Sequence, residues 1–236
     1  DGYRGKTVDF ARYSDRHRTS LAHFLSKGKW DPAALEKNLR ESIIEKVYQH
    51  GRETKQPVLC IIDDTIASKT RPSSQAVHPM EATSDHMSHL KGRMDYGHQA
   101  IGVMLACGEL VLNYAILLYD KSQSKIDMVS SIANTLPAPP NIGYLLCDSW
   151  YTCDVEVFFR TTKGKLALDK YQLRSATGIR RFWLLMSLTH FLCCVGSGVL
   201  RSFSEGYEYW QTLVLRNVVQ HVYNCGKNGT PLAMLG

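Results

Sequence analysis

Apolar residues recur at helical spacing through the first fifty positions of the chain. The segment 31–50, "DPAALEKNLRESIIEKVYQH", begins with Asp31 as a candidate N-cap and Pro32 in the first helical position. Its apolar residues then fall on one helical face: Leu35, Leu39, Ile43 and Val47. The segment 14–25, "SDRHRTSLAHFL", has the same spacing behind another candidate N-cap, Ser14. Two helices are therefore predicted before residue 52.

Short apolar runs further along the chain predict strands. The run 57–65, "PVLCIIDDT", ends in acids and is typical of a buried strand, and "NIGYLLCD" at 141–148 predicts another. The segment 98–120 indicates two strands around the Cys107–Gly108 turn. Residues 67–97 are polar with little periodicity, which predicts a long loop.

The remaining segments have helical spacing, and the order of elements indicates the α/β class. Helices are predicted at 124–136, 154–165, 177–195 and 207–226. The run 182–200 carries no charge and is long enough to span a membrane. His190 and the interruption between Gly196 and Gly198 favour a buried core helix instead, so no membrane partner is expected.

Composition and charge narrow the class of protein. The 236 residues are 44% hydrophobic and 21% charged, which indicates a globular core and excludes a disordered chain. Seven scattered Cys indicate reduced cysteines inside a cell rather than a disulfide framework. The chain begins at Asp1 and not at Met, so we expect it to be a segment of a longer protein.

The positive charge is unevenly distributed. The net charge of +6 is compatible with a polyanionic partner. Between residues 160 and 204 the chain has eight Lys or Arg residues and one acid, Asp169. Two interpretations stay open: a solvated face, or a surface that follows the phosphates of a nucleic acid.

Several acids stand at the ends of predicted strands. Asp63 and Asp64 close one strand, Asp148 closes another, and Glu156 follows on a predicted helix. Sites in open α/β sheets form beyond strand ends, and such carboxylates could bind two Mg²⁺ ions for phosphodiester chemistry. A single acid at a strand end is more often a turn residue or a cap. Lys163 lies two helical turns after Glu156, where it could hold a phosphate.

Two other interpretations compete with this one. Glu156 and Arg160 are four residues apart and would also suit a surface ion pair. Four histidines fall in or beside the predicted loop: His78, His86, His89 and His98. Because no Cys lies between Cys60 and Cys107, we favour a polar loop or DNA contacts over a zinc site.

Long motifs in a fixed order resemble those of one family. They are "CIIDDTIASKTRPSSQAVHP", "SHLKGRMDYGHQAIGVML", "LLCDSWYTC" and "VEVFFRTTKGKLALDKYQLRSATGIRRFW". Together they resemble the cut-and-paste insertion-sequence transposases of bacteria, DDE enzymes with a Y-x2-R-x3-E-x6-K signature. The resemblance runs from about Tyr3 to the end of the chain.

The resemblance implies a catalytic set. Its first acid is Asp64, because Thr65 follows as in the family, with Asp63 as the neighbouring candidate. Asp148 and Glu156 are then the other acids and metal ligands, with Mg²⁺ or Mn²⁺ as cofactor, and Lys163 is the signature lysine. The implied reaction is hydrolysis at the transposon ends followed by strand transfer.

The resemblance also implies a fold, partners and a location. Residues 1–52 would be part of a helical DNA-binding segment, and 53–236 a ribonuclease-H-like catalytic domain, a mixed sheet flanked by helices. The expected partner is double-stranded DNA, both transposon ends and target, with a homodimer left open. The expected location is the bacterial cytoplasm, at the nucleoid. The residues expected to contact DNA are Arg16, Arg18, Lys91, Arg93, Arg160, Lys163 and Arg174.

The chain departs from the family between the second and third acids. The positions of the signature Tyr and Arg hold Ser149 and Thr152, and only seven residues separate Asp148 from Glu156. Relatives have a long, strand-rich insertion there. We infer an internal deletion before Val155, which removes the insertion domain and leaves a sheet edge exposed.

This departure leaves three functional alternatives. The first is a DDE transposase domain whose catalysis is impaired or lost. The second is a non-catalytic remnant that binds DNA through its cations. The third is a metal-dependent nuclease without specificity for transposon ends. Metal dependence would separate the second alternative from the other two.

Overall fold

The computed structural model describes residues 17–88, 91–147, 159, 163–166, 168–171 and 173–228. The chain forms two compact units, Asp1–Thr189 and His190–Gly236. The first contains a mixed five-stranded sheet, and the second contains the end of one helix and the whole of another. Each unit is described by itself.

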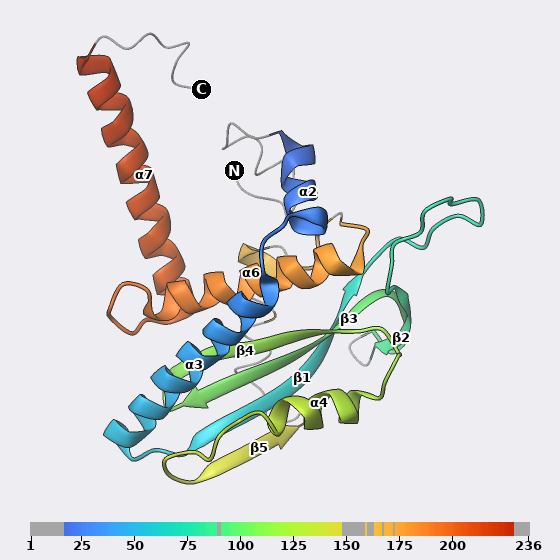
Figure 1. Cartoon of the computed structure of the whole chain (residues 1–236), viewed down its shortest axis with the longest axis horizontal. Helices are drawn as coiled ribbons and strands as arrows, with labels where there is room; N and C mark the ends of the chain where they lie inside the picture. Colours follow the sequence, from blue (N-terminus) through green and yellow to red (C-terminus); the bar gives the residue numbers. More distant parts are fainter. Residues whose placement is uncertain are drawn as a thin grey trace. The chain divides into compact units, whose positions relative to one another are not determined.

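The sheet of the first unit is mostly antiparallel. Its strands are β1 (Val58–Ser68), β2 (Ser84–Ser88), β3 (Arg93–Cys107), β4 (Leu110–Tyr119) and β5 (Gly143–Cys147). The order is β2-β3-β1-β5, and β4 also pairs with β3 (Figure 1). Among the described strands, β1 and β5 alone run parallel. This mixed α/β arrangement is consistent with the expected ribonuclease-H-like fold.

Helices precede, connect and follow the strands. They are α2 (Arg18–Lys27), α3 (Pro32–Thr54), α4 (Lys125–Ala133), α6 (Ala176–Val195) and α7 (Phe203–Lys227). The predicted start of α3 is confirmed, because Asp31 Oδ1 accepts hydrogen bonds from the amides of Ala33 and Ala34 at 2.9 and 3.0 Å. The N-cap of α2 is His17, while the predicted cap Ser14 lies outside the described residues.

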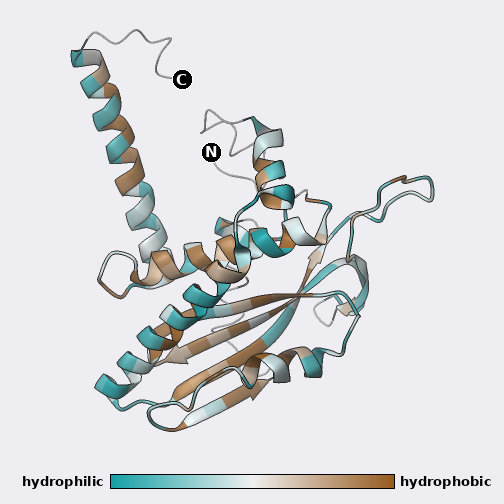
Figure 2. Ribbon diagram, in the orientation of Figure 1, coloured by the Kyte–Doolittle hydropathy of each residue, from teal (hydrophilic) through white to brown (hydrophobic). Residues whose placement is uncertain are grey.

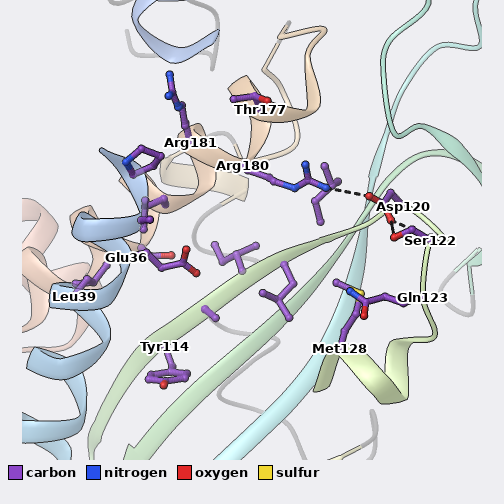
Figure 3. Close-up of a pocket in the computed structure, with 18 residues that line it drawn as sticks. Glu36, Leu39, Tyr114, Asp120, Ser122, Gln123, Met128, Thr177, Arg180 and Arg181 are labelled. Atoms are coloured by element: carbon purple, nitrogen blue, oxygen red, sulfur yellow. Dashed lines mark hydrogen bonds and ion pairs between the residues drawn. The ribbon is translucent and has the colours of Figure 1, made fainter. Parts of the chain in front are cut away.

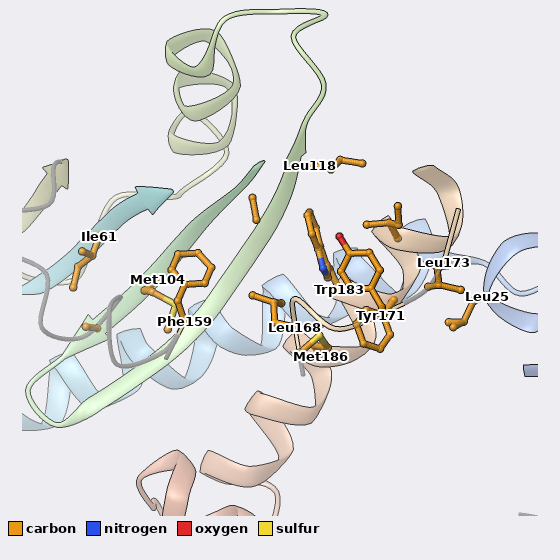
Figure 4. Packing of buried hydrophobic residues seen from close by; sticks show 14 residues of the cluster. Leu25, Ile61, Met104, Leu118, Phe159, Leu168, Tyr171, Leu173, Trp183 and Met186 are labelled. Atoms are coloured by element: carbon orange, nitrogen blue, oxygen red, sulfur yellow. The ribbon is translucent and has the colours of Figure 1, made fainter. Parts of the chain in front are cut away.

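The main core lies on one face of the sheet. Ile61 of β1, Met104 of β3 and Trp183 of α6 belong to one buried cluster together with Phe159 (Figure 4). On the other face, α3 packs against the sheet: the Tyr48 hydroxyl donates to the Pro137 carbonyl, and Gly51 lies against the Val58 side chain. The two faces of β1 therefore have different neighbours, which matters for its acids.

The prediction of a long loop at 67–97 is wrong. This range contains β2 and the first residues of β3, which begins at Arg93. In β2 the polar His86 and Ser88 are buried while Met87 is 52% exposed. Because the apolar residue faces outward and the polar ones inward, hydrophobic periodicity gives no strand signal there.

The strand predicted at 141–148 is present as β5, but it is not buried. Tyr144 and Leu145 are 51% and 54% exposed. Within the described part of the chain, β5 pairs with β1 alone, so it forms an edge of the sheet. An exposed apolar edge favours association with other chains.

The second unit packs around the start of α7. The rings of His190 and Phe203 stack with centroids 5.0 Å apart, and Trp210 Nε1 donates to the Leu192 carbonyl at 3.1 Å. The predicted helices 177–195 and 207–226 are confirmed as α6 and α7. Among the described residues, no helix is long and apolar enough to cross a membrane.

Candidate active site

The two neighbouring acids of β1 point to opposite faces of the sheet. Successive side chains alternate along a strand, so Asp63 shares a face with Thr65 while Asp64 lies on the other face. In the antiparallel register, Asp63 stands opposite Gly102 and Asp64 opposite Ile101. The surroundings of each face therefore separate the two candidates for the first metal ligand.

Asp64 is held in an ion pair. Its Oδ2 accepts a hydrogen bond from Lys125 Nζ at 2.6 Å, at the start of α4. The Lys125 ammonium also lies 5.4 Å from the centroid of the Tyr119 ring. Both charged side chains are more than one third exposed, so this pair is a surface feature on the α4 face.

Asp63 lies on the face that Phe159 and Lys163 contact, two residues of the segment 156–163 that carries the family signature and is here called the signature segment. Lys163 Nζ donates to Thr65 Oγ1 at 2.6 Å. The Phe159 ring lies over Gly102, so closely that a Cβ added at Gly102 would be 2.7 Å from Phe159 Cζ. Directly opposite residues of an antiparallel pair share a face. Two side chains of the signature segment thus flank Asp63, one over its cross-strand partner and one at the next residue on its face.

The electrostatics of Lys163 agree with this placement. Burial lowers the pKa of the Lys163 ammonium, and the nearby carboxylates of Asp169 and Asp63 oppose that change while Lys91 adds to it. The Asp63 carboxylate also accepts a hydrogen bond from the Asp64 amide at 2.7 Å. Lys163 is therefore a partly buried cation in the field of Asp63, which suits contact with an anionic group.

The other two predicted ligands, Asp148 and Glu156, lie outside the described residues. The last described pair of the parallel ladder is Ile62 with Cys147, one residue before Asp63 and Asp148 in the two segments. In the described ranges, no group of three or more His, Cys, Asp or Glu side chains could hold a metal ion.

The residues predicted to contact DNA have different surroundings. Arg93 and Arg174 are exposed, and Arg174 also donates to the His78 carbonyl at 3.4 Å. Lys91 is paired with Asp95 at 2.6 Å. The positions of Arg16, Arg160 and the Arg18 side chain lie outside what the structure describes.

Two cations of the basic stretch serve the fold of the first unit. Arg180 pairs with Asp120 at 3.0 Å, and Arg181 donates to the Gly28 carbonyl at 2.9 Å. The positive charge between 160 and 204 is therefore partly used within the fold. Fewer of its cations are available to a nucleic acid than the sequence count indicates.

The expectation that the loop histidines form a polar loop or contact DNA is wrong for His98. This side chain is fully buried on β3. Its Nε2 donates to the Glu81 carbonyl at 2.8 Å, and its Nδ1 accepts from the Tyr171 hydroxyl at 2.9 Å. Burial lowers the pKa of His98 to about 4. His86 is buried beside Ser84, and His89 lies outside the described residues.

A buried polar network was missed by the sequence reasoning. Lys69 Nζ donates to the carbonyls of Asp169 and Tyr171 at 2.5 and 3.0 Å and lies 3.8 Å from the centroid of the Tyr171 ring. Burial lowers its pKa to about 8. Together with His98, Lys69 ties β1 and β3 to the segment that follows Lys163. In the sequence, Lys69 is only one more polar residue of an aperiodic stretch.

The first unit also has a cavity of about 450 Å³. It lies between α3, β4 and α6, and Arg180 and Asp120, which form an ion pair, are among the residues that line it (Figure 3). Neither acid of β1 nor Lys163 lines it. The cavity is thus separate from the face that carries Asp63, and it offers no carboxylate cluster for phosphodiester chemistry.

The mixed sheet with acids on its central strand is consistent with the expected fold, and comparison with known families identifies the family. The chain belongs to the DDE superfamily endonucleases, whose family model matches residues 7–185. Membership implies DNA as the substrate class and divalent-metal chemistry as that of the superfamily. No curated protein and no solved structure matches the chain.

Proposed function

We propose that the chain is a DDE transposase domain with impaired catalysis and that its metal site forms on the Asp63 face. The ligands would be Asp63, Asp148 and Glu156, and the cofactor Mg²⁺ or Mn²⁺. The observation that carries this choice is the placement of Phe159 and Lys163 on the Asp63 face. Glu156 precedes Phe159 by three residues, and Asp64 is already paired on the opposite face.

A metal site on this face requires Asp148 to stand level with Asp63. The parallel register of β1 and β5, which ends at Ile62 and Cys147, would then continue by one residue. Carboxylate oxygens are the ligands that Mg²⁺ prefers, so the donor set fits the ion. When bound, the metal supplies an activated water and stabilises the leaving oxygen.

Lys163 is proposed to bind the scissile phosphate. Its ammonium is held at Thr65 and remains in the field of Asp63, so it is oriented before DNA arrives. The exposed Arg93 and Arg174 are proposed to contact the flanking phosphates. Such a protein would act in the bacterial cytoplasm, at the nucleoid.

The exposed edge of β5 supports the proposed deletion. A strand that follows the second acid and covers this edge would account for the apolar Tyr144 and Leu145, which are half exposed as the chain stands. We propose that the missing block shaped the transposon-end pocket in an insertion-sequence ancestor. Simple strand cleavage would then survive at a reduced rate, while strand transfer would not.

Nicking of supercoiled plasmid tests this function. We expect slow conversion to open circles with Mn²⁺ or Mg²⁺, none with EDTA, and none for Asp63→Asn. Retention of DNA on a filter at low salt without any nicking would contradict the proposal and favour the non-catalytic DNA-binding alternative. Arg93→Gln should weaken that retention, whereas Arg180→Gln should not, because Arg180 is occupied by Asp120.

A further inference from the structure

The loop between β1 and β2, residues 69–83, extends away from the sheet of the first unit (Figure 1). Residues 70–79 are all exposed, and Val77 is 83% exposed, more than any other large apolar side chain in the described ranges. The rest of the loop is largely polar, as its colouring in Figure 2 shows. A single exposed valine is ordinary on a protein surface, so its surroundings decide whether it has a function.

Both ends of this loop are fixed to the folded unit. At its start, the Lys69 ammonium donates the two hydrogen bonds described above. At its end, the Glu81 amide donates to the Arg174 carbonyl at 2.9 Å, and the Glu81 carboxylate accepts from the Ala176 amide at 2.8 Å. Ala82 has a φ of 56°, a conformation that alanine keeps only where its surroundings enforce it. Residues 72–79, between these fixed ends, are here called the loop tip.

The loop tip is itself restricted in conformation. Pro72 and Pro79 stand at its two ends, and proline fixes φ near −65°. Between them, the Ala76 amide donates to the Ser73 carbonyl at 3.1 Å and closes a turn. A segment that is restricted before it meets a partner loses less conformational entropy on binding. The loop tip is therefore suited to contact with a partner although it is fully exposed.

The side chains of the loop indicate what kind of partner it fits. The sequence has no Asp or Glu from 69 to 80, so no carboxylate there repels a polyanion. Lys69 is engaged within the fold and Arg71 is paired with Asp85, so the loop supplies few cations for phosphates. The tip instead offers hydroxyl and amide groups beside its apolar stretch, from Ser73, Ser74 and Gln75. These groups suit hydrogen bonds to base edges in a groove better than contacts with phosphates.

We propose that the loop tip enters the minor groove of the DNA duplex beside the cleaved bond, with Val77 inserted at a base step. The inference rests on the proposed function, because it takes the Asp63 face as the site of cleavage. β1 continues for five residues from Asp63 to Ser68, about 17 Å, so the loop leaves the sheet roughly five base pairs from the cleaved bond. Arg174, a proposed phosphate contact, donates to the His78 carbonyl, so one duplex can reach both.

The choice of groove follows from the shape of the loop tip. The minor groove is about 6 Å wide, and proteins that bind it insert apolar side chains between base steps. The major groove, about 12 Å wide, admits a helix or a two-stranded ribbon, and the loop tip is neither. DNA is also the substrate class of the family to which the chain belongs. The partner that fits the loop tip is therefore duplex DNA.

Fluorescence anisotropy of a labelled, A·T-rich duplex tests the contact, with EDTA present so that no cleavage is required. Val77→Asp should raise the Kd at least about fivefold, because the phosphates repel a carboxylate and it cannot replace an apolar side chain between bases. The matched control Val199→Asp makes the same exchange at a loop valine of the second unit that is 57% exposed, and it should bind like the parent. Because both valines are exposed, equal melting temperatures of the three proteins show that each is folded.

Distamycin, which occupies the minor groove of A·T-rich DNA, tests the choice of groove. It should weaken binding of the parent several-fold and change binding of Val77→Asp much less. A parent that is insensitive to distamycin would overturn the inference. Equal binding of the parent and Val77→Asp, or equal losses in Val77→Asp and Val199→Asp, would also overturn it while leaving the proposed function in place. A parent that binds no duplex even at low salt would contradict both.

Discussion

The contact between Phe159 and Gly102 places Phe159 on the same face of the sheet as Asp63. This contact can be perturbed directly by mutation. In Gly102→Ala, the new Cβ would lie 2.7 Å from Phe159 Cζ and 3.2 Å from Cε2, so the ring must move. Overpacking of this kind costs about 1–3 kcal/mol. Replacing a strand glycine by alanine otherwise gains roughly 0.5–1 kcal/mol. We therefore expect a net loss of up to about 2.5 kcal/mol in the free energy of unfolding.

A double-mutant cycle isolates the contact. In a Phe159→Leu background the ring is absent, so Gly102→Ala should become neutral or stabilising, with a coupling energy of at least about 1 kcal/mol. The assay is urea denaturation followed by circular dichroism, with unchanged m-values. Gly164→Ala is the control in the same segment, because a Cβ there meets nothing within 4 Å. Equal stabilisation by Gly102→Ala in both backgrounds would refute the placement of Phe159 over Gly102.

Three further predictions concern stability and solubility. The folded chain keeps His98 neutral down to about pH 4, whereas the unfolded chain protonates it near pH 6.5. The free energy of unfolding should therefore decrease by up to about 3 kcal/mol as the pH is lowered from 6.5 to 4. The urea midpoint of His98→Gln should decrease less over the same pH range. Leu145 lies on the exposed edge strand, so Leu145→Thr should slow aggregation, measured by light scattering, without lowering the melting temperature. Leu146 packs against the core, so Leu146→Thr should lower the melting temperature. Asp31→Ala should cost about 1 kcal/mol in urea denaturation, and Asp31→Ser should restore most of it.

Most of the fold follows from local sequence signals. The helix at Pro32 and the strand pair around Gly108 are predicted because their caps, turns and apolar periods agree. β2 was missed because its inward residues are polar and owe their burial to hydrogen bonds and neighbouring strands. The exposure of β5 was also missed, since an apolar run does not reveal whether a neighbouring strand is present on both sides.

The choice between Asp63 and Asp64 in the candidate site likewise does not follow from local sequence signals. The sequence places Asp63 and Asp64 side by side, and a family motif favours Asp64 because Thr65 follows. Which acid faces the signature segment depends on strand pairing and on the position of Phe159, which no local pattern specifies. A one-residue change in register would exchange the two faces, so this assignment needs tertiary structure.

The most direct test of the account is metal-dependent thermal unfolding of the parent, Asp63→Asn and Asp64→Asn. A ligand that binds only the folded state raises stability by mass action, by about 2.7 kcal/mol at a hundred times Kd. We predict that Mn²⁺ and Mg²⁺ raise the melting temperature of the parent and of Asp64→Asn but leave Asp63→Asn unchanged. A shift that survives Asp63→Asn and disappears in Asp64→Asn would contradict the assignment. A parent that does not respond to either metal would show that no metal site forms on this face.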